Sequence, residues 1–444
     1  MSALHQRGCS LSANATILIR AAARQYRNTR NPCAPTFAVQ FVRLSHDAAP
    51  TKAAAIVVGA GPAGIAVVGN LLENTKDGRI VWIDREFHGG RINHTYREVP
   101  GNTAVKLFVD YVKALEPFRD IYNSAGTPNA ITALEELPQS GTCSLSYAGD
   151  MLNFITEGLR KHPRVESIKE QVRSAERDVT SSNWTVSASN NLPYASAPLL
   201  VYCTGSHPTE IEADYLPKRL NLDTALTPSR LSELLAEALS KGNGPPTIGV
   251  LGGSHSAILV LMNLYAIAKQ QPEQIRIRWF PRSETLKYAE QRDGYILNDN
   301  TGLKGRAAEF ARTNLDGDAL ATSPAGKFIE RHVLLGSKDD QQKTLSSGLK
   351  GCTFLVQAIG YTRGKLPSTV VGGREVTGKG LKVNPRTGTL GEDGDGLYGA
   401  GIAFPEEVDT PEGGQEMAVG MWKFMKYLKR VVPEWVEKTG AGKR

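Results

Sequence analysis

Three closely spaced glycines, Gly59, Gly61 and Gly64, form the first pattern in the sequence that could do chemistry. They have the form G-x-G-x-x-G, with Pro62 and Ala63 between the second and the third. The first glycine allows a tight turn, the second lets the backbone approach a pyrophosphate, and the third lets a helix pack closely on a strand. Exposed N–H groups at the start of that helix would hold the phosphates. The pattern predicts a dinucleotide site.

A carboxylate at the expected distance supports this interpretation. Asp84 follows Gly64 by twenty residues and ends an apolar run that is typical of a strand. An acid at that place accepts hydrogen bonds from ribose hydroxyls. The alternative is a purely structural turn between a strand and a helix, because glycine loops recur by chance. We expect the loop and Asp84 together to bind a dinucleotide.

A second glycine loop begins at Gly252 and has Ser254 where a second glycine is expected, with Ala257 completing the pattern. The serine either donates a hydrogen bond to a phosphate or blocks its approach. After the next strand, Arg282 stands where an acid would bind ribose. A guanidinium there would pair with a 2′-phosphate and select NADPH over NADH. The alternatives are a solvated Arg282 and, for His255 in the loop, a structural histidine.

Alternating strands and helices position both loops. The first loop lies between a strand at 54–58 and a helix at 64–72, and the second between 247–251 and 256–269. Each is a βαβ unit and requires a parallel sheet. The expected fold class is α/β, with two Rossmann-like dinucleotide-binding domains, the second inserted in the first. Further strands are expected at 79–84, 183–187, 199–203, 275–280, 353–359 and 396–400, and helices at 150–161 and around 417–428, whereas 290–350 shows no clear pattern.

Two nucleotide folds in one chain have a chemical meaning. A hydride moves efficiently only when a nicotinamide is held against a flavin ring. We therefore expect FAD in the first domain and NADPH in the second. The expected boundaries are 52–225 for the first part of the FAD domain, 226–350 for the NADPH domain, 351–432 for the second part of the FAD domain, and 433–444 for a tail.

The net charge of +7 is concentrated at the front of the chain. Residues 1–46 hold six arginines and no Asp, Glu or Lys, so the remainder is near +1 and gives no case for nucleic-acid binding. This composition is typical of a transit peptide. Arg43 lies two residues before the expected cut, which a matrix protease would make after Leu44. We expect mitochondrial targeting. The alternative is a disordered leader without a targeting signal.

Other classes are disfavoured by the rest of the composition. The five cysteines include no C-x-x-C pair, which argues against a metal site and against dithiol chemistry. The longest run without charge, 53–72, could suggest a membrane helix, but the glycine loop inside it favours a strand, a turn and a helix. We expect no metal and no transmembrane segment.

The layout resembles the flavin-containing monooxygenases and the related FAD- and NADPH-dependent N-hydroxylases over nearly all of 52–430. Residues 84–91 resemble the stretch that brings backbone beside the flavin, and 203–208 and 357–361 resemble the two linker strands of the family. Residues 99–106 are similar to the segment with an active-site asparagine, which implies Asn102. Beyond the residues of the two loops, the cofactor contacts so implied are Arg85, Gly90, Arg91, Thr204, Gly205 and Gly401.

The resemblance implies that NADPH reduces the flavin, that O2 reacts with it, and that oxygen passes to a soft nucleophile. Such an enzyme needs a dry pocket and a hydrogen-bond donor, for which Asn102 is the candidate. The alternative for Asn102 is an Asx turn. Residues 222–228 replace the usual Phe-Gly-His fingerprint and put oxygen transfer in question, whereas Ile402, where reductases keep a flavin-binding aspartate, favours a monooxygenase.

The predicted function is an FAD- and NADPH-dependent oxidoreductase, a monooxygenase acting with O2 on a nitrogen, sulfur or carbonyl centre of a small molecule. One alternative is a mitochondrial reductase that passes electrons to a quinone or a protein. Another is a redox sensor that holds FAD without turnover. Residues 107–147 and 284–350 are expected to shape the substrate pocket, but they match no motif that would name a substrate.

Overall fold

The computed structural model describes residues 49–188, 193–241, 244–271, 274–376, 381–392 and 394–442. The predicted targeting segment, 1–46, lies outside these residues, as does the predicted cut after Leu44.

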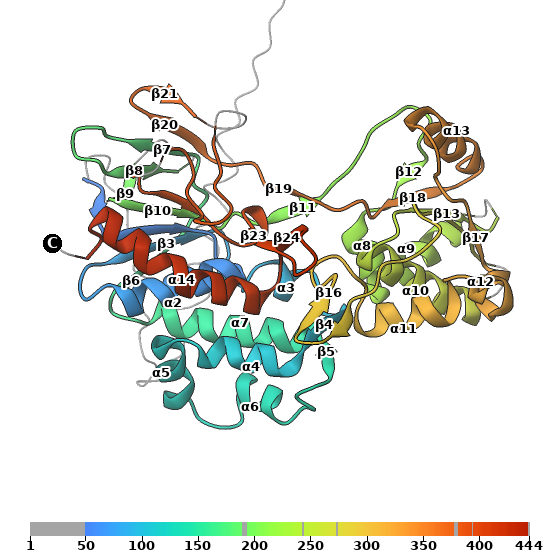
Figure 1. Cartoon of the computed structure of the whole chain (residues 1–444), viewed down its shortest axis with the longest axis horizontal. Coiled ribbons are helices and arrows are strands. Elements are labelled where there is room, and N and C mark those ends of the chain that lie inside the picture. The colour runs from blue at the N-terminus through green and yellow to red at the C-terminus, as the bar shows by residue number, and fades with distance from the viewer. Residues whose placement is uncertain are drawn as a thin grey trace, which may run out of the picture. The chain divides into compact units, whose positions relative to one another are not determined.

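A five-stranded parallel sheet carries the first glycine loop (Figure 1). Every residue of its strands β2 and β10 is buried, so each reads in the sequence as a continuous apolar run. The helix α2 follows β2 and begins at Pro62, whose fixed φ suits the first turn of a helix. The strands, in sheet order, are β22 (Leu397–Gly399), β10 (Leu199–Tyr202), β2 (Ala55–Val58), β3 (Ile80–Asp84) and β6 (Val165–Lys169), and α2 is Pro62–Asn74.

Alternate side chains of this sheet enter two separate cores. Ala55 and Val57 of β2 pack among the helices, whereas Ile56 and Val58 pack with Trp184 of a second, six-stranded sheet. This alternation follows from the period of two along a strand. The second sheet has the order β1 (Thr51–Lys52), β9 (Pro193–Ala197), β8 (Trp184–Ser187), β7 (Ser174–Arg177), β20 (Ser368–Val371) and β21 (Arg374–Glu375).

The helices on the first sheet include α2, α7 (Leu145–Arg160) and the long α14 (Met421–Thr439), which runs beside α2 (Figure 1). We expected a tail from residue 433, but α14 continues through Pro433, because Trp435 and Val436 are buried in the helical core. The remaining helices of this part are α3 (Arg91–His94), α4 (Val105–Lys113), α5 (Glu116–Ser124) and α6 (Ala130–Glu135).

A third sheet, again five-stranded and parallel, carries the second glycine loop. It takes strands from both sides of the expected 226–350 domain, because β12 and β18 pair with each other and β18 pairs with β13. Its order is β12 (Lys218–Arg219), β18 (Phe354–Gln357), β13 (Thr247–Leu251), β14 (Arg276–Phe280) and β17 (Ile329–Arg331). Its helices are α8 (Leu222–Leu226), α9 (Pro228–Ser240), α10 (His255–Gln270), α11 (Gly305–Asn314), α12 (Ala319–Thr322) and α13 (Lys338–Gly348), with a 3-10 turn at Pro324–Lys327. A further 3-10 turn, Gly401–Ala403, follows β22 of the first sheet.

Short antiparallel pairs complete the fold. The pair β11 and β19 lies where the chain enters and leaves the third sheet, because β11 stands between β10 of the first sheet and β12, and β19 stands between β18 and β20 of the second sheet. The predicted fold class, α/β with a second nucleotide-type domain inserted in the first, is confirmed. The pairs are β11 (Ser206–Pro208) with β19 (Tyr361–Arg363), β4 (Pro100–Ala104) with β5 (Thr142–Ser144), β15 (Glu290–Arg292) with β16 (Tyr295–Leu297), and β23 (Glu406–Asp409) with β24 (Gln415–Ala418).

In the part of the chain that is described, no helix combines the length and the apolarity needed to cross a bilayer. The charge-free run 53–72 is divided between β2, the glycine loop and α2.

Candidate cofactor-binding site

The three glycines of the first loop play different roles. Gly59 has φ +110°, and a Cβ there would lie 2.2 Å from the Cys203 carbonyl oxygen. A Cβ on Gly64 would lie 1.9 Å from the Gly59 carbonyl oxygen. In contrast, a Cβ on Gly61 would meet no described atom nearer than 4.0 Å, the Cα of Gly90. Gly59 and Gly64 therefore serve packing, and Gly61 leaves open the space that a pyrophosphate would need.

The start of α2 is closely packed on both of its flanks. The Tyr111 hydroxyl donates a hydrogen bond to the Pro62 carbonyl (2.6 Å). A Cβ added to Gly401, which has φ +81°, would lie 2.5 Å from the Cβ of Ala63. Gly401 thus lies at the N-terminus of α2, and the side chain of Ile402 next to it is exposed.

Asp84 ends β3 and organises the backbone around it. Its Oδ2 accepts from the N–H of Ala60 (2.8 Å), and its Oδ1 accepts from those of Glu86 (2.8 Å) and Phe87 (2.9 Å). The carboxylate therefore ties the glycine loop to the turn after β3, and Oδ2 retains capacity for a ribose hydroxyl. That second role stays a prediction, as does a cofactor contact for the exposed Arg85.

The turn after β3 brings the double glycine against the first loop. Buried Phe87 has φ +59°, in the left-handed region that is costly for an aromatic residue, and Gly90 has φ +72°. A Cβ on Gly90 would lie 2.8 Å from the Cα of Gly61. The next residue, Arg91, is thereby placed at the edge of the predicted site, where it pairs with Asp223 of α8.

An unsatisfied polar group lies where β10 ends. The Thr204 hydroxyl is buried and has no hydrogen-bond partner among the described residues, and Gly205 has φ +70°. Buried polar atoms are nearly always paired in proteins, so an orphan one next to a nucleotide loop indicates a ligand contact. The unpaired Thr204 hydroxyl and the open space at Gly61 together fit a bound dinucleotide.

The second loop repeats the geometry of the first. Gly252 has φ +130°, and a Cβ there would lie 2.3 Å from the Ala358 carbonyl oxygen. Ala257 is buried in α10, whereas Ser254 is exposed at the N-cap and its side chain makes no capping hydrogen bond. Its hydroxyl is therefore available to a phosphate, and the serine does not fill the loop.

Arg282 lies beside this loop. A Cβ on Gly253 would lie 3.3 Å from the Cβ of Pro281, so the turn after β14 adjoins the turn after β13. The Arg282 side chain is exposed, and within the described ranges it makes no ion pair. Its guanidinium is available to a 2′-phosphate, as the sequence predicts.

Asn102 does not form the Asx turn that was the alternative to a catalytic role. It lies in the middle of β4 with its side chain exposed, where its Oδ1 accepts a long hydrogen bond from Thr103 (3.4 Å). The neighbouring Gly101 carbonyl oxygen approaches Gly305 at the start of α11. The exposed amide is free to donate to a ligand, and its catalytic role stays a prediction.

Residues 284–350, which we expected to shape the pocket, reach back to the C-terminal part of the chain. The Asp299 carboxylate pairs with Lys304 (2.5 Å) and with Lys423 of α14 (2.6 Å). Glu416 of β24 accepts from the side chains of Asn300 (2.9 Å) and Thr301 (2.8 Å). These contacts fix the loop after β16, which showed no pattern in the sequence because its partners lie more than a hundred residues away.

Two polar residues at this site were not predicted from the sequence. Asp223 and Tyr96 both bind Arg91, with Nη2 of Arg91 lying 2.5 Å from Asp223 Oδ2 and 2.7 Å from the Tyr96 hydroxyl. The one available signal was the acid in 222–228, the segment that departs from the family fingerprint.

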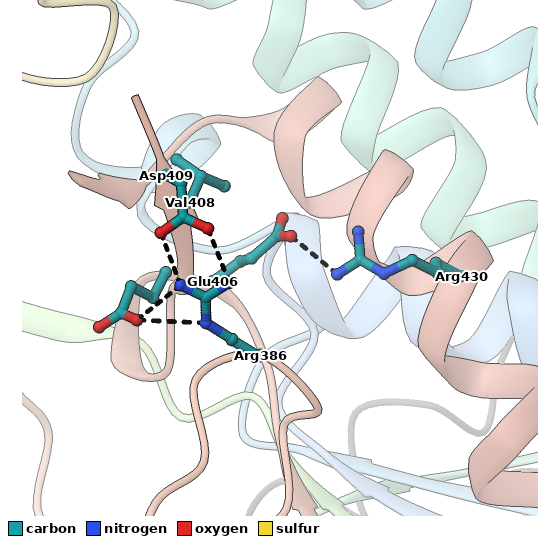
Figure 2. Close-up of a pocket in the computed structure, with 6 residues that line it drawn as sticks. Arg386, Glu406, Val408, Asp409 and Arg430 are labelled. Atoms are coloured by element: carbon teal, nitrogen blue, oxygen red, sulfur yellow. Dashed lines mark hydrogen bonds and ion pairs between the residues drawn. The ribbon is translucent and has the colours of Figure 1, made fainter. Parts of the chain in front are cut away.

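A pocket of another kind lies at β23 and α14 (Figure 2). Arg386 binds Asp409 (2.7 Å) and Glu407 (3.2 Å), and Arg430 binds Glu406 (2.7 Å). Its charges are paired among themselves, and none of the predicted cofactor residues lines it. It is therefore a surface ion-pair network and not the nucleotide site. Among the described residues, no group of three His, Cys, Asp or Glu side chains could hold a metal ion.

The imidazole of His255 is predicted to make the protein sensitive to acid. Burial, helped by the charge of Lys304, lowers the pKa of His255 to about 4, and its Nδ1 has no partner among the described residues. In the unfolded chain a histidine titrates near pH 6.5. The folded state thus disfavours protonation of His255. The contribution of the neutral imidazole to the free energy of unfolding is therefore complete above about pH 6.5 and is lost as the pH falls toward 4.

We therefore expect His255→Gln to lose less stability in acid than the wild type does. The difference between their free energies of unfolding should change by about 3 kcal/mol between pH 7 and pH 4. Urea unfolding of both proteins at several pH values measures it. Two parallel pH profiles would show that His255 does not titrate on unfolding.

The chain is similar in sequence to a known monooxygenase. No model of a known protein family matches the chain. The monooxygenase AgnR1 of Paecilomyces divaricatus is 45% identical to it over 401 residues, which are 87% of this chain and 99% of the relative. An alignment of that extent and identity relates the two proteins by descent.

Among solved structures, the ornithine N-hydroxylase of Kutzneria sp. 744 has a TM-score of 0.52 at 13% identity, covering 88% of this chain and 100% of that one. The cadaverine monooxygenase of Erwinia amylovora has a TM-score of 0.50 at 11% identity, over 89% and 94% of the two chains. The bacillithiol disulfide reductase of Staphylococcus aureus also scores 0.50 at 11% identity, over 87% and 99%. At such identities these likenesses show the fold alone, and the fold is common to hydroxylases and a reductase.

Proposed function

This chain belongs to the flavin-dependent monooxygenase family, and we propose that it uses NADPH to reduce a bound FAD and transfers one oxygen atom of O2 to a small molecule. The second oxygen atom leaves as water, with both electrons for its reduction coming from NADPH. We propose a nitrogen, sulfur or carbonyl centre as the acceptor. The observation that carries the proposal is the 45% identity to a monooxygenase over nearly its whole length.

The residues of the first loop suit FAD. Gly61 leaves room for the pyrophosphate, Asp84 has an acceptor for ribose, and Thr204 has an unused buried hydroxyl. FAD, when bound, supplies the centre that accepts a hydride and reacts with O2. Ser254 of the second loop and Arg282, which follows β14, suit the phosphates of NADPH, and both adjoin a sheet other than the one that carries the first loop.

The two alternatives have weaker support. A reductase of this fold would be favoured by an acid after Gly401, whereas this chain has the exposed, apolar Ile402 there. No feature of the described residues is specific to a redox sensor that holds FAD without turnover. The fold itself does not discriminate, because it occurs in enzymes of both chemistries.

Oxygen consumption tests the function directly. The purified protein is reduced anaerobically with NADPH and then mixed with O2, and NADPH oxidation, O2 uptake and oxygenated product are followed with a panel of small amines, sulfides and ketones. We expect one class to couple NADPH oxidation to product. Rapid electron transfer to a quinone with slow reaction toward O2 would favour the reductase.

For localisation, we propose that residues 1–46 direct the protein to the mitochondrial matrix and are then removed. The support is the sequence, with six arginines before the first acid at Asp47. We expect the mature protein, isolated from cells, to begin near residue 45, which N-terminal sequencing measures. A mitochondrial protein that retains Met1, or a cytosolic one, would contradict the proposal.

A further inference from the structure

The segment that replaces the family fingerprint, 222–228, packs against the stretch after the double glycine. The Tyr96 hydroxyl donates to Asp223 Oδ1 (2.9 Å) while Arg91 binds Asp223 Oδ2. A few residues on, the Ser229 N–H donates to Glu98 (3.0 Å) at the start of α9. Residues near the first glycine loop and residues of the third sheet's domain are thus joined by polar contacts.

The centre of this contact is a paired charge that is partly shielded from water. The side chain of Asp223 is 17% exposed and that of Arg91 is 38% exposed. Burial, together with the nearby Tyr361 hydroxyl (3.4 Å), raises the pKa of Tyr96, so its phenol stays protonated and donates. A partly buried guanidinium with a carboxylate and a phenol on it is held in one place, and removing the carboxylate would leave its charge unpaired.

The position of Arg91 gives this charge a function. It directly follows Gly90, which packs on Gly61, the glycine that leaves room for the cofactor. Resting on the proposed function, we propose that Asp223 is a positioning residue that holds the Arg91 guanidinium beside the flavin and offsets its charge, and so sets the reduction potential of the flavin.

The expected size follows from Coulomb's law. Reduction adds negative charge to a flavin, so a nearby cation favours the reduced form and a nearby anion disfavours it. At about 10 Å and an effective dielectric constant of about 20, one unit charge changes the equilibrium constant roughly tenfold. For a two-electron couple, tenfold corresponds to about 30 mV.

The experiment measures the potential of the FAD-loaded protein by anaerobic equilibration with redox dyes. We expect Asp223→Asn to raise the potential by about 30 mV, Arg91→Met to lower it by a similar amount, and the double variant to return close to the wild type. Glu98→Gln is the matched control, because it removes an acid from the same contact but not from Arg91. Its potential should stay at the wild-type value.

Several results would overturn the inference. One is an unchanged potential in Asp223→Asn, and another is an equal shift in Glu98→Gln. If Asp223→Asn does not fold, the double variant still tests the idea, since it should lie about tenfold, or about 30 mV, above Arg91→Met. Weaker FAD binding by Arg91→Met, with a wild-type potential in the fraction that still holds FAD, would overturn the inference and assign the guanidinium to the pyrophosphate instead.

These outcomes are separate from failure of the proposed function. A wild-type protein that binds no FAD, or that never consumes O2, would remove the proposed function. A wild-type protein that couples NADPH oxidation to oxygenation but whose potential ignores Asp223 would remove this inference alone.

Discussion

Gly61→Val is expected to give a folded protein that no longer binds FAD. A Cβ at this position meets no described atom nearer than 4.0 Å, and the backbone φ of −80° is one that any residue adopts. The protein alone therefore tolerates a side chain, and the cofactor does not, since the pyrophosphate passes at the closest approach. We expect the flavin absorbance per protein to fall to background while the circular dichroism spectrum is unchanged.

Gly64→Ala is the matched control, because it lies in the same loop and its Cβ would clash with the protein itself, at 1.9 Å from the Gly59 carbonyl oxygen. It should lower the thermal unfolding temperature whether or not FAD is present. A Gly61→Val protein that retains FAD would place the pyrophosphate elsewhere. A colourless wild type that cannot be reconstituted with FAD would contradict the whole assignment.

Local patterns in the sequence were enough to predict the two βαβ units. Strand β13 was expected at 247–251 and lies there, because Ile248, Val250 and Leu251 are buried and apolar and Gly252 ends the strand. The loops were predictable because a glycine with positive φ, such as Gly59 or Gly252, has few substitutes.

What the sequence did not predict depends on partners far along the chain. Strand β18 pairs with β13 across about a hundred residues, so its place in the third sheet could not be inferred from its own composition. The extension of α14 beyond Pro433 depends on the burial of Trp435, and the role of Asp223 on an arginine 132 positions earlier. In each case tertiary contacts outweigh the local signal.

Arg282→Ala is expected to weaken NADPH about tenfold and to leave NADH almost unchanged. The guanidinium is exposed, lies after β14 beside the second glycine loop, and has no ion-pair partner among the described residues, so its charge is available to a 2′-phosphate. A charge-assisted hydrogen bond contributes about 1.5 to 3 kcal/mol, and exposure to solvent favours the lower figure. That corresponds to about tenfold in affinity.

The form of the loss is as informative as its size. The 2′-phosphate is remote from the hydride, so the KM for NADPH should rise while the limiting rate of flavin reduction stays the same. The preference for NADPH should also shrink as salt is added, because the pair is open to screening. Arg276→Ala is the matched control, since Arg276 is exposed at the opposite end of the same strand, away from the loop. Flavin reduction measured with both cofactors decides the assignment: if the wild type prefers NADH, or if Arg282→Ala weakens both cofactors equally, Arg282 is a surface residue and some other group selects the cofactor.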